Sequence, residues 1–197
     1  MIEIGNYNSL KNSSNEYAYR KFVLESLSSG VQLKLIKKYS GKSFSFYMTC
    51  ILPIYFDYFE NSCIHPSFIV ETLEGIKILK NGNWNENCTA KDNYCFSFSL
   101  TWGYCELVML ETPVEYQHKG FAGSALDIIK DIIIEYNKLI EAGSYQMLKD
   151  LRKIKYITGE AIPCGNCALN FERLINFYKK NGFSVNNTNK ILLIFEK

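Results

Sequence analysis

The chain has 197 residues, of which 47% are apolar and 21% are charged, and its formal net charge is +2. This composition is typical of a globular protein with a full core, and the weak charge argues against nucleic-acid and membrane-surface partners. The sequence shows no secretion signal and no apolar run long enough to cross a bilayer, so we expect a cytoplasmic protein. Its seven cysteines are then expected to be reduced thiols in a single domain that spans residues 1–197.

The first half of the chain allows only coarse predictions. Residues 16–29 carry aromatic and aliphatic side chains at helical spacing before Gly30, which predicts a helix. Residues 31–37 alternate apolar and polar side chains and predict a half-buried strand, and residues 43–52 predict another. A short helix is expected over residues 66–73, where a proline suits the first turn.

The second half shows clearer periodicities. Residues 94–101 and 104–110 alternate on either side of Gly103, which predicts an antiparallel hairpin. Residues 122–136 then repeat apolar side chains at helical spacing. The remaining expected elements are a strand at 154–161, a helix at 168–180 and a strand at 191–195. This order requires at least one parallel strand pair joined by a crossover helix, so the predicted fold class is α/β, more closely mixed α+β.

Small residues crowd the junction between a predicted strand and the long helix after it. Gly120, Ala122 and Gly123 lack side chains that would keep an anion away from the first N–H groups of that helix. His118 and Lys119 add hydrogen-bond donors and charge. The stretch has two interpretations, a pyrophosphate-binding cradle or a flexible turn that tolerates glycine. It matches neither the P-loop nor the three-glycine dinucleotide pattern, which argues against NTP and NAD.

Two stretches resemble the signatures of the GCN5-related N-acetyltransferases (GNAT). QHKGFA at residues 117–122 matches the family's Q/R-x-x-G-x-G/A motif for the pyrophosphate of acetyl-CoA, and NFYKKNGF at residues 176–183 resembles the end of its fourth helix. The resemblance implies a central, mostly antiparallel sheet with a parallel, splayed central strand pair and flanking helices. It also implies that residues 94–197 form the acetyl-CoA-binding core and residues 1–93 a divergent acceptor-side half.

The resemblance further implies roles for single residues. Tyr178 stands where the family has a tyrosine that reaches the CoA sulfur as general acid, and a phenol stays protonated at neutral pH. Glu106 is the predicted base, with Glu111 in reserve, because histone-acetyltransferase-like members carry a glutamate at a similar spacing. The structural alternatives are a packed aromatic for Tyr178 and a solvent-facing strand residue for Glu106. The predicted acetyl-CoA contacts are Leu110, Glu111, Thr112, Gln117, His118, Lys119, Gly120, Phe121, Ala122, Gly123 and Ser124, and no metal ligand is predicted.

The predicted function is therefore direct transfer of an acetyl group from acetyl-CoA to an amine acceptor within a ternary complex. The acceptor is a small molecule or a protein, which no motif identifies, and a homodimer is compatible with the sequence. A catalytically silent acyl-CoA-binding or protein-interaction module is the alternative. Cys164 and Cys167, spaced as CGNC between a strand and a helix, allow a third hypothesis, a thiol redox protein or half of a zinc site.

Overall fold

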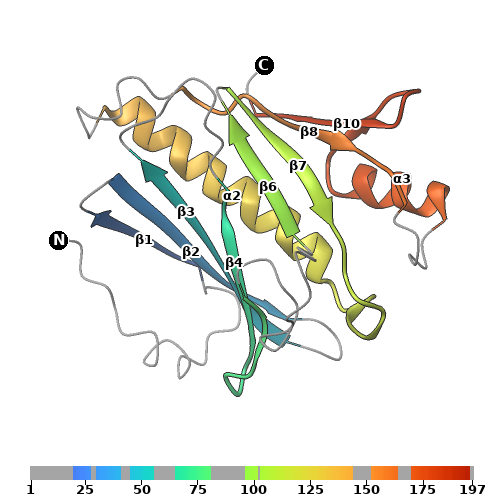
Figure 1. Ribbon diagram of the computed structural model, residues 1–197, viewed down its shortest axis with the longest axis horizontal. Coiled ribbons are helices and arrows are strands. Elements are labelled where there is room, and N and C mark those ends of the chain that lie inside the picture. The colour runs from blue at the N-terminus through green and yellow to red at the C-terminus, as the bar shows by residue number, and fades with distance from the viewer. Residues whose placement is uncertain are drawn as a thin grey trace.

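The computed structural model describes residues 20–27, 30–40, 45–55, 65–80, 96–101, 103–143, 152–163 and 170–195. In these ranges the strands form two five-stranded sheets, and one long helix runs beside both of them (Figure 1). A second, shorter helix lies next to the far edge of the second sheet. The fold is a mixed α+β fold with mostly antiparallel sheets.

The first sheet has the order β1-β2-β3-β4-β5, and all neighbouring strands are antiparallel. Its strands are β1 (Arg20–Leu27), β2 (Gly30–Ser40), β3 (Ser45–Tyr55), β4 (Ser67–Thr72) and β5 (Lys77–Lys80). The strands predicted at residues 31–37 and 43–52 are confirmed as β2 and β3. On β2, Leu33 and Leu35 are buried as the alternating pattern indicated, whereas β3 is buried without a break from Phe46 to Cys50.

Both helices predicted for the first half are wrong. Within residues 16–29, the described segment is strand β1, which pairs with β2 from Leu27 opposite Gly30 to Arg20 opposite Lys37. Residues 66–73 contain β4, where Phe68 and Val70 are buried at a period of two and the strand pairs with β3. In both segments, pairing with a neighbouring strand outweighs the local helical signal. Strand β5 was not predicted.

The second sheet has the order β6-β7-β8-β10-β9. Its strands are β6 (Phe96–Thr101), β7 (Tyr104–Leu110), β8 (Tyr156–Glu160), β9 (Ser184–Val185) and β10 (Lys190–Ile194). The predicted hairpin is confirmed as β6 and β7, and the predicted parallel pair as β7 and β8, with helix α2 (Phe121–Ala142) as the crossover. The sequence predicted one central sheet, whereas the described strands form two. The short strand β9 was not predicted.

Helix α2 connects the two sheets. Its buried face packs against β2 and β3 of the first sheet and contains Ile128, Ile129, Ile132 and Ile133. Near its end, the buried side chain of Asn137 donates to the backbone oxygen of Ile154 and accepts from its N–H, both at 2.8 Å. These two bonds fix the segment that leads into β8, so the same helix contacts the first sheet and orients the second.

The two sheets also touch directly. The ring of Phe68 on β4 lies 5.7 Å from that of Phe96 and 5.6 Å from that of Phe98, both on β6. Next to them, His65 Nδ1 is 3.2 Å from the backbone oxygen of Phe98. The buried aromatic residues of both sheets therefore belong to one core. Within the described ranges, none of the helices is both long and apolar enough to cross a membrane.

Candidate ligand-binding site

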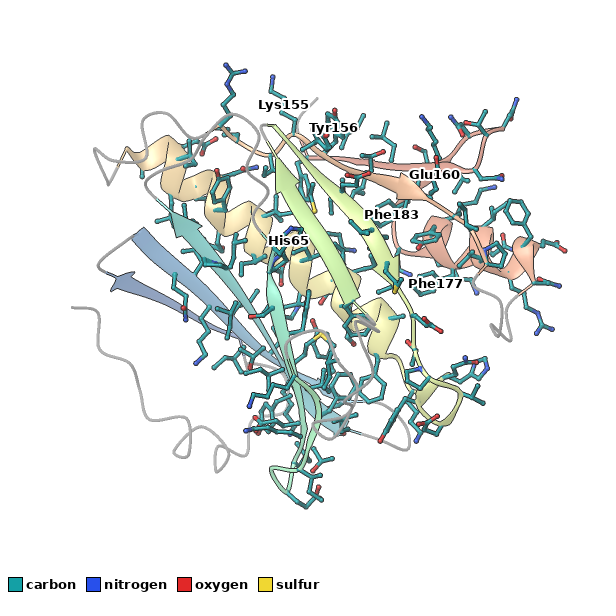
Figure 2. All side chains as sticks on the ribbon, in the orientation of Figure 1. His65, Lys155, Tyr156, Glu160, Phe177 and Phe183 are labelled. Carbon is teal, nitrogen blue, oxygen red and sulfur yellow. The ribbon has the colours of Figure 1, made fainter. Side chains whose placement is uncertain are left out.

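A cavity of about 710 Å³ opens between β7, β8, the start of α2 and helix α3 (Phe171–Lys180). Figure 2 shows two of its lining residues, Glu160 on β8 and Phe177 on α3. Eleven predicted site residues line this cavity: Glu106, Leu110, Glu111, Thr112, Gln117, His118, Gly120, Phe121, Ala122, Gly123 and Tyr178. Residues separated by about 70 positions in the sequence thus meet around one space.

The cavity begins where the parallel strands separate. Strands β7 and β8 pair from Tyr104 opposite Tyr156 to Leu107 opposite Gly159, and β7 continues beyond that point to Leu110. On its other side, β7 carries a β-bulge at Val108, because the partners of β6 change there from Met109 to Leu107. A bulge bends a strand and increases its local twist, and this bulge directly follows Leu107, the last residue of β7 that pairs with β8.

Gly159 allows β7 and β8 to approach closely just before they separate. A Cβ atom at this position would lie 2.8 Å from the backbone oxygen of Leu107 and 3.5 Å from Cδ1 of Ile191. Real Cβ atoms essentially never come within 3.0 Å of another heavy atom, and the backbone oxygen of Leu107 cannot move aside as a flexible side chain does. The glycine therefore sets the position of the wall that β8 contributes to the cavity.

The loop between β7 and α2 has a compact backbone. It contains the short helix η1 (Val114–Tyr116), and Gln117 Nε2 donates to the backbone oxygen of Thr112 at 3.1 Å. His118 and Gly120 have positive φ values of 60° and 91°. A left-handed conformation is favourable for glycine, which explains the glycine that directly precedes the helix.

The first turn of α2 faces this loop. Gly120 caps the helix without a side-chain hydrogen bond, and the N–H of Ser124 donates to the oxygen of Gly120 at 2.9 Å. The N–H groups of Phe121, Ala122 and Gly123 precede that bond and lie at the positive end of the helix dipole. A Cβ added at Gly120 would meet nothing within 4 Å, so the space beside the helix start is open.

Thr112 presents an unsatisfied polar atom at the cavity. Its Oγ1 is buried and has no hydrogen-bond partner, and it is the only such side-chain atom in the described part of the chain. A buried hydroxyl without a partner is unfavourable by about 1–3 kcal/mol, so such atoms commonly mark a place where a ligand or water binds.

Tyr178 is held by the end of α3. The helix begins at Asn170, whose Oδ1 accepts a hydrogen bond from the N–H of Arg173 at 2.9 Å. It ends in a turn where Gly182 has a φ of 90° and the N–H of Phe183 donates to the oxygen of Tyr178 at 3.1 Å. The Tyr178 ring is 5% exposed and packs edge-on against its neighbours Phe177 and Phe183. Packing against these two rings thus holds Tyr178, which is one of the cavity's lining residues.

Glu106 reaches the cavity, but it is an exposed residue of β7. Its exposure agrees with the alternative of a solvent-facing strand residue, while its place in the cavity lining keeps it a candidate base. Glu111 also lines the cavity and lies past the end of β7. Both candidate bases, Glu106 and Glu111, therefore line the cavity, and the geometry favours neither of them.

Two predicted contacts lie outside the cavity lining. Lys119 is exposed, and its Nζ lies 5.2 Å from the centre of the Tyr116 ring. Ser124 is buried in α2, where its backbone oxygen is 3.2 Å from the hydroxyl of Tyr39. Lys119 lies in the exposed turn before α2, whereas Ser124 lies inside the helix.

The cysteines of the CGNC motif, Cys164 and Cys167, lie outside the described residues. Cys50 and Cys105 are buried free thiols, and burial raises the pKa of both, so they remain protonated. Among the residues that the structure describes, no cluster of three or more histidine, cysteine, aspartate or glutamate side chains could hold a metal ion.

The sequence did not identify ten further residues that line the cavity. They are Leu107, Val108, Met109, Tyr116, Gly159, Glu160, Ile162, Pro163, Leu174 and Phe177. Gly159 carried a usable signal, because a glycine inside a strand marks a bulge or a close backbone approach.

Comparisons of the chain with protein-family models, with curated proteins and with solved structures found no match.

Proposed function

We propose that this chain is an N-acetyltransferase of the GNAT type, which moves an acetyl group from acetyl-CoA to an amine. The observation that carries the proposal is the cavity where β7 and β8 diverge, because the start of α2 and Tyr178 both face it. Residues 117–122 and 176–183, the two stretches that resemble the family, thus contribute lining residues to the same cavity although they are far apart in the sequence. A parallel pair with a helical crossover is also what the resemblance implies.

The residues present fit acetyl-CoA. Its pyrophosphate is an anion, which suits the N–H groups of Phe121, Ala122 and Gly123 and the open space at Gly120. The end of β7 lies beyond its pairing with β8 and offers backbone groups to the amide-containing arm of the donor. The buried Thr112 Oγ1 adds a hydroxyl that needs a partner. These features match an elongated ligand with one anionic end.

Bound acetyl-CoA supplies a thioester that a neutral amine can attack. The chain must then accept a proton from the amine and donate one to the departing sulfur as the C–N bond forms and the C–S bond breaks. Glu106 or Glu111, directly or through a water, accepts the first proton, and the Tyr178 hydroxyl donates the second. Backbone N–H groups near Leu110 stabilise the negative charge that develops on the carbonyl oxygen.

Titration calorimetry with acetyl-CoA tests the donor site. We expect wild-type protein to bind and Gly120→Glu to lose binding, since its carboxylate would enter the anion cradle. Gly143→Glu is the matched control, because Gly143 is also an exposed glycine with positive φ, at the other end of the same helix. No binding by the wild type, or equal binding by the two variants, would disprove the donor site.

A silent acyl-CoA-binding module is the second candidate, and the exposure of Glu106 favours it. Thiol release from acetyl-CoA across a panel of amines, with mass spectrometry of the products, distinguishes the two. The enzyme transfers acetyl groups, and Tyr178→Phe reduces its turnover with little change in acetyl-CoA affinity. Binding without release for every amine would support the module instead.

A further inference from the structure

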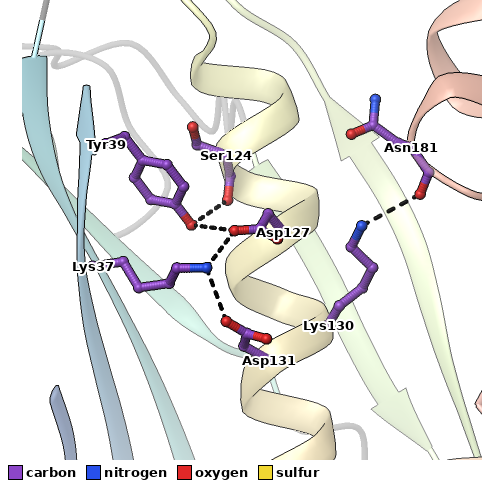
Figure 3. A network of polar contacts seen from close by, with 7 residues as sticks. All are labelled: Lys37, Tyr39, Ser124, Asp127, Lys130, Asp131 and Asn181. Atoms are coloured by element: carbon purple, nitrogen blue, oxygen red, sulfur yellow. Dashed lines mark hydrogen bonds and ion pairs between the residues drawn. The ribbon is translucent and has the colours of Figure 1, made fainter. Parts of the chain in front are cut away.

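A polar network joins the first sheet to the first turns of α2 (Figure 3). Lys37 on β2 forms an ion pair with Asp127 and a second one, with its Nζ 2.9 Å from Oδ2, with Asp131. The hydroxyl of Tyr39 lies 3.0 Å from Asp127 Oδ2 and 3.2 Å from the backbone oxygen of Ser124. The first sheet thus holds α2 at three points between residues 124 and 131, directly behind the loop at Gly120.

These contacts differ in kind from the rest of the interface. Between them α2 packs against the sheets with aliphatic side chains such as Ile128 and Ile132. The hydrophobic effect behind apolar packing is non-directional. A hydrogen bond requires a donor–acceptor distance of about 2.7–3.2 Å and a nearly linear angle. The network therefore adds directional contacts between the first sheet and the first turns of α2 to the non-directional packing of the aliphatic side chains.

The network is partly buried and stays ionised. The side chains of Lys37 and Asp131 are only 18% and 19% exposed, whereas that of Asp127 is 44% exposed. Burial opposes the charge of Lys37, but its hydrogen bonds to the two aspartates outweigh burial and raise its pKa. Burial also opposes the charge of Asp127, yet the hydrogen bond and charge of Lys37 lower the pKa of that carboxyl. The contacts thus persist throughout the neutral pH range.

A row of aromatic rings leads from this network to the cavity. The ring of Tyr39 stacks on that of Phe46 at 5.5 Å, and Phe46 lies 4.4 Å from Phe121. Phe121 in turn packs edge-on against Tyr116 at 5.9 Å. The last two residues line the cavity. A displacement of Tyr39 would therefore reach the cavity wall through adjacent, closely packed side chains.

We propose that Lys37, Tyr39 and Asp127 are positioning residues, which hold the start of α2 and its preceding loop in the orientation that binds the acyl donor. The identity of the ligand rests on the proposed function, whereas the positioning of the helix does not. The first sheet, which carries no recognisable motif, then contributes directly to ligand affinity.

The affinity for acetyl-CoA tests this role. Lys37→Met keeps the length of the side chain but removes its charge, and we expect the Kd to rise about tenfold, as a small misplacement of binding groups does. Lys37→Arg restores the charge and most of the affinity. Lys138→Met is the matched control, since it breaks the ion pair of Lys138 with Glu135 farther along α2. Val70→Ala, a core truncation on β4, controls for loss of stability alone, and both controls keep the wild-type Kd.

Amide hydrogen exchange without ligand tests positioning independently of the donor. We expect faster exchange for residues 124–131 in Lys37→Met and, to a smaller extent, in Tyr39→Phe, which removes one hydroxyl and serves if Lys37→Met does not fold. The same residues keep wild-type exchange in Lys138→Met. Failure of the wild type to bind acetyl-CoA would disprove the proposed donor, and the exchange contrast would still decide the positioning. Exchange equal to that of the control, or a Kd unchanged in Lys37→Met, would overturn it.

Discussion

The two sheets differ in how completely their strands are paired. In the first sheet every neighbouring pair is antiparallel, and β2 and β3 stay paired over eleven residues each. The parallel pair of the second sheet stops after four residue pairs, at Leu107 opposite Gly159. The cavity lies beyond that point. The candidate site thus lies where the parallel pair ends, while the long antiparallel pair of β2 and β3 packs against α2 from the other side.

Truncating the contact between the sheets has the largest expected effect. Phe68 is fully buried and touches two rings of the second sheet, so Phe68→Ala is expected to lower the free energy of unfolding by about 4 kcal/mol. Urea unfolding measures the change, with Ile76→Ala as control because Ile76 is 65% exposed in the same sheet region. Similar losses in both variants would show that the two sheets are not coupled through this residue.

A side chain added at Gly159, where β7 and β8 separate, has a smaller expected effect on stability. Gly159→Ala would push its Cβ against the oxygen of Leu107, and we expect a cost of about 2 kcal/mol together with a wider separation of β7 and β8. Gly123→Ala is the control for stability, since its Cβ would meet Asn181 Oδ1 at an ordinary 3.8 Å. Urea unfolding that ranks Gly123→Ala as the more harmful variant would contradict the close approach inferred at Gly159.

Protonation of Asp127 by acid has the smallest expected effect on stability, and it should weaken the ion pair between this residue of α2 and Lys37 of the first sheet. Asp127 faces Lys37, Tyr39, Lys130 and Asp131, and its pKa is lowered below the ordinary 3.8. Its contribution is therefore present above about pH 4 and is lost as the pH falls through the folded-state pKa. Asp127→Asn is expected to be less stable than wild type by about 1 kcal/mol at pH 7, since the pair is partly exposed. Urea unfolding at decreasing pH should find the difference between the two proteins shrinking below about pH 4, and a difference that stays constant down to the lowest pH would exclude this carboxylate as its source.

The second sheet was the more predictable part of the fold. The hairpin at Gly103 and the long period of α2 are local signals, and local signals are what a sequence displays directly. The segment of β1 was predicted as a helix because its apolar residues also fit helical spacing, and that of β4 because Pro66 suits a first helical turn. Only pairing with β2 and β3 decides their structure, and that pairing joins residues that are distant in the chain.

The candidate site was predictable to a similar degree. The residues of the loop at Gly120 and Tyr178 stand in recognisable short motifs, and they line one cavity. Glu160 and Ile162 were missed because only the parallel register brings the end of β8 to the cavity. The bulge at Val108 was missed because one extra residue in a strand leaves the apolar alternation nearly unchanged.

The crossover position of α2 also has a consequence for how the chain folds. Hairpin β6–β7 joins close neighbours in sequence, whereas the pairing of β8 with β7 spans the 22 residues of α2. Because α2 docks on β2 and β3, the parallel pair depends on contacts of long sequence separation. We therefore expect the edge of β7 that faces β8 to stay unpaired until these distant contacts form, and an unpaired strand edge can pair with another chain during folding.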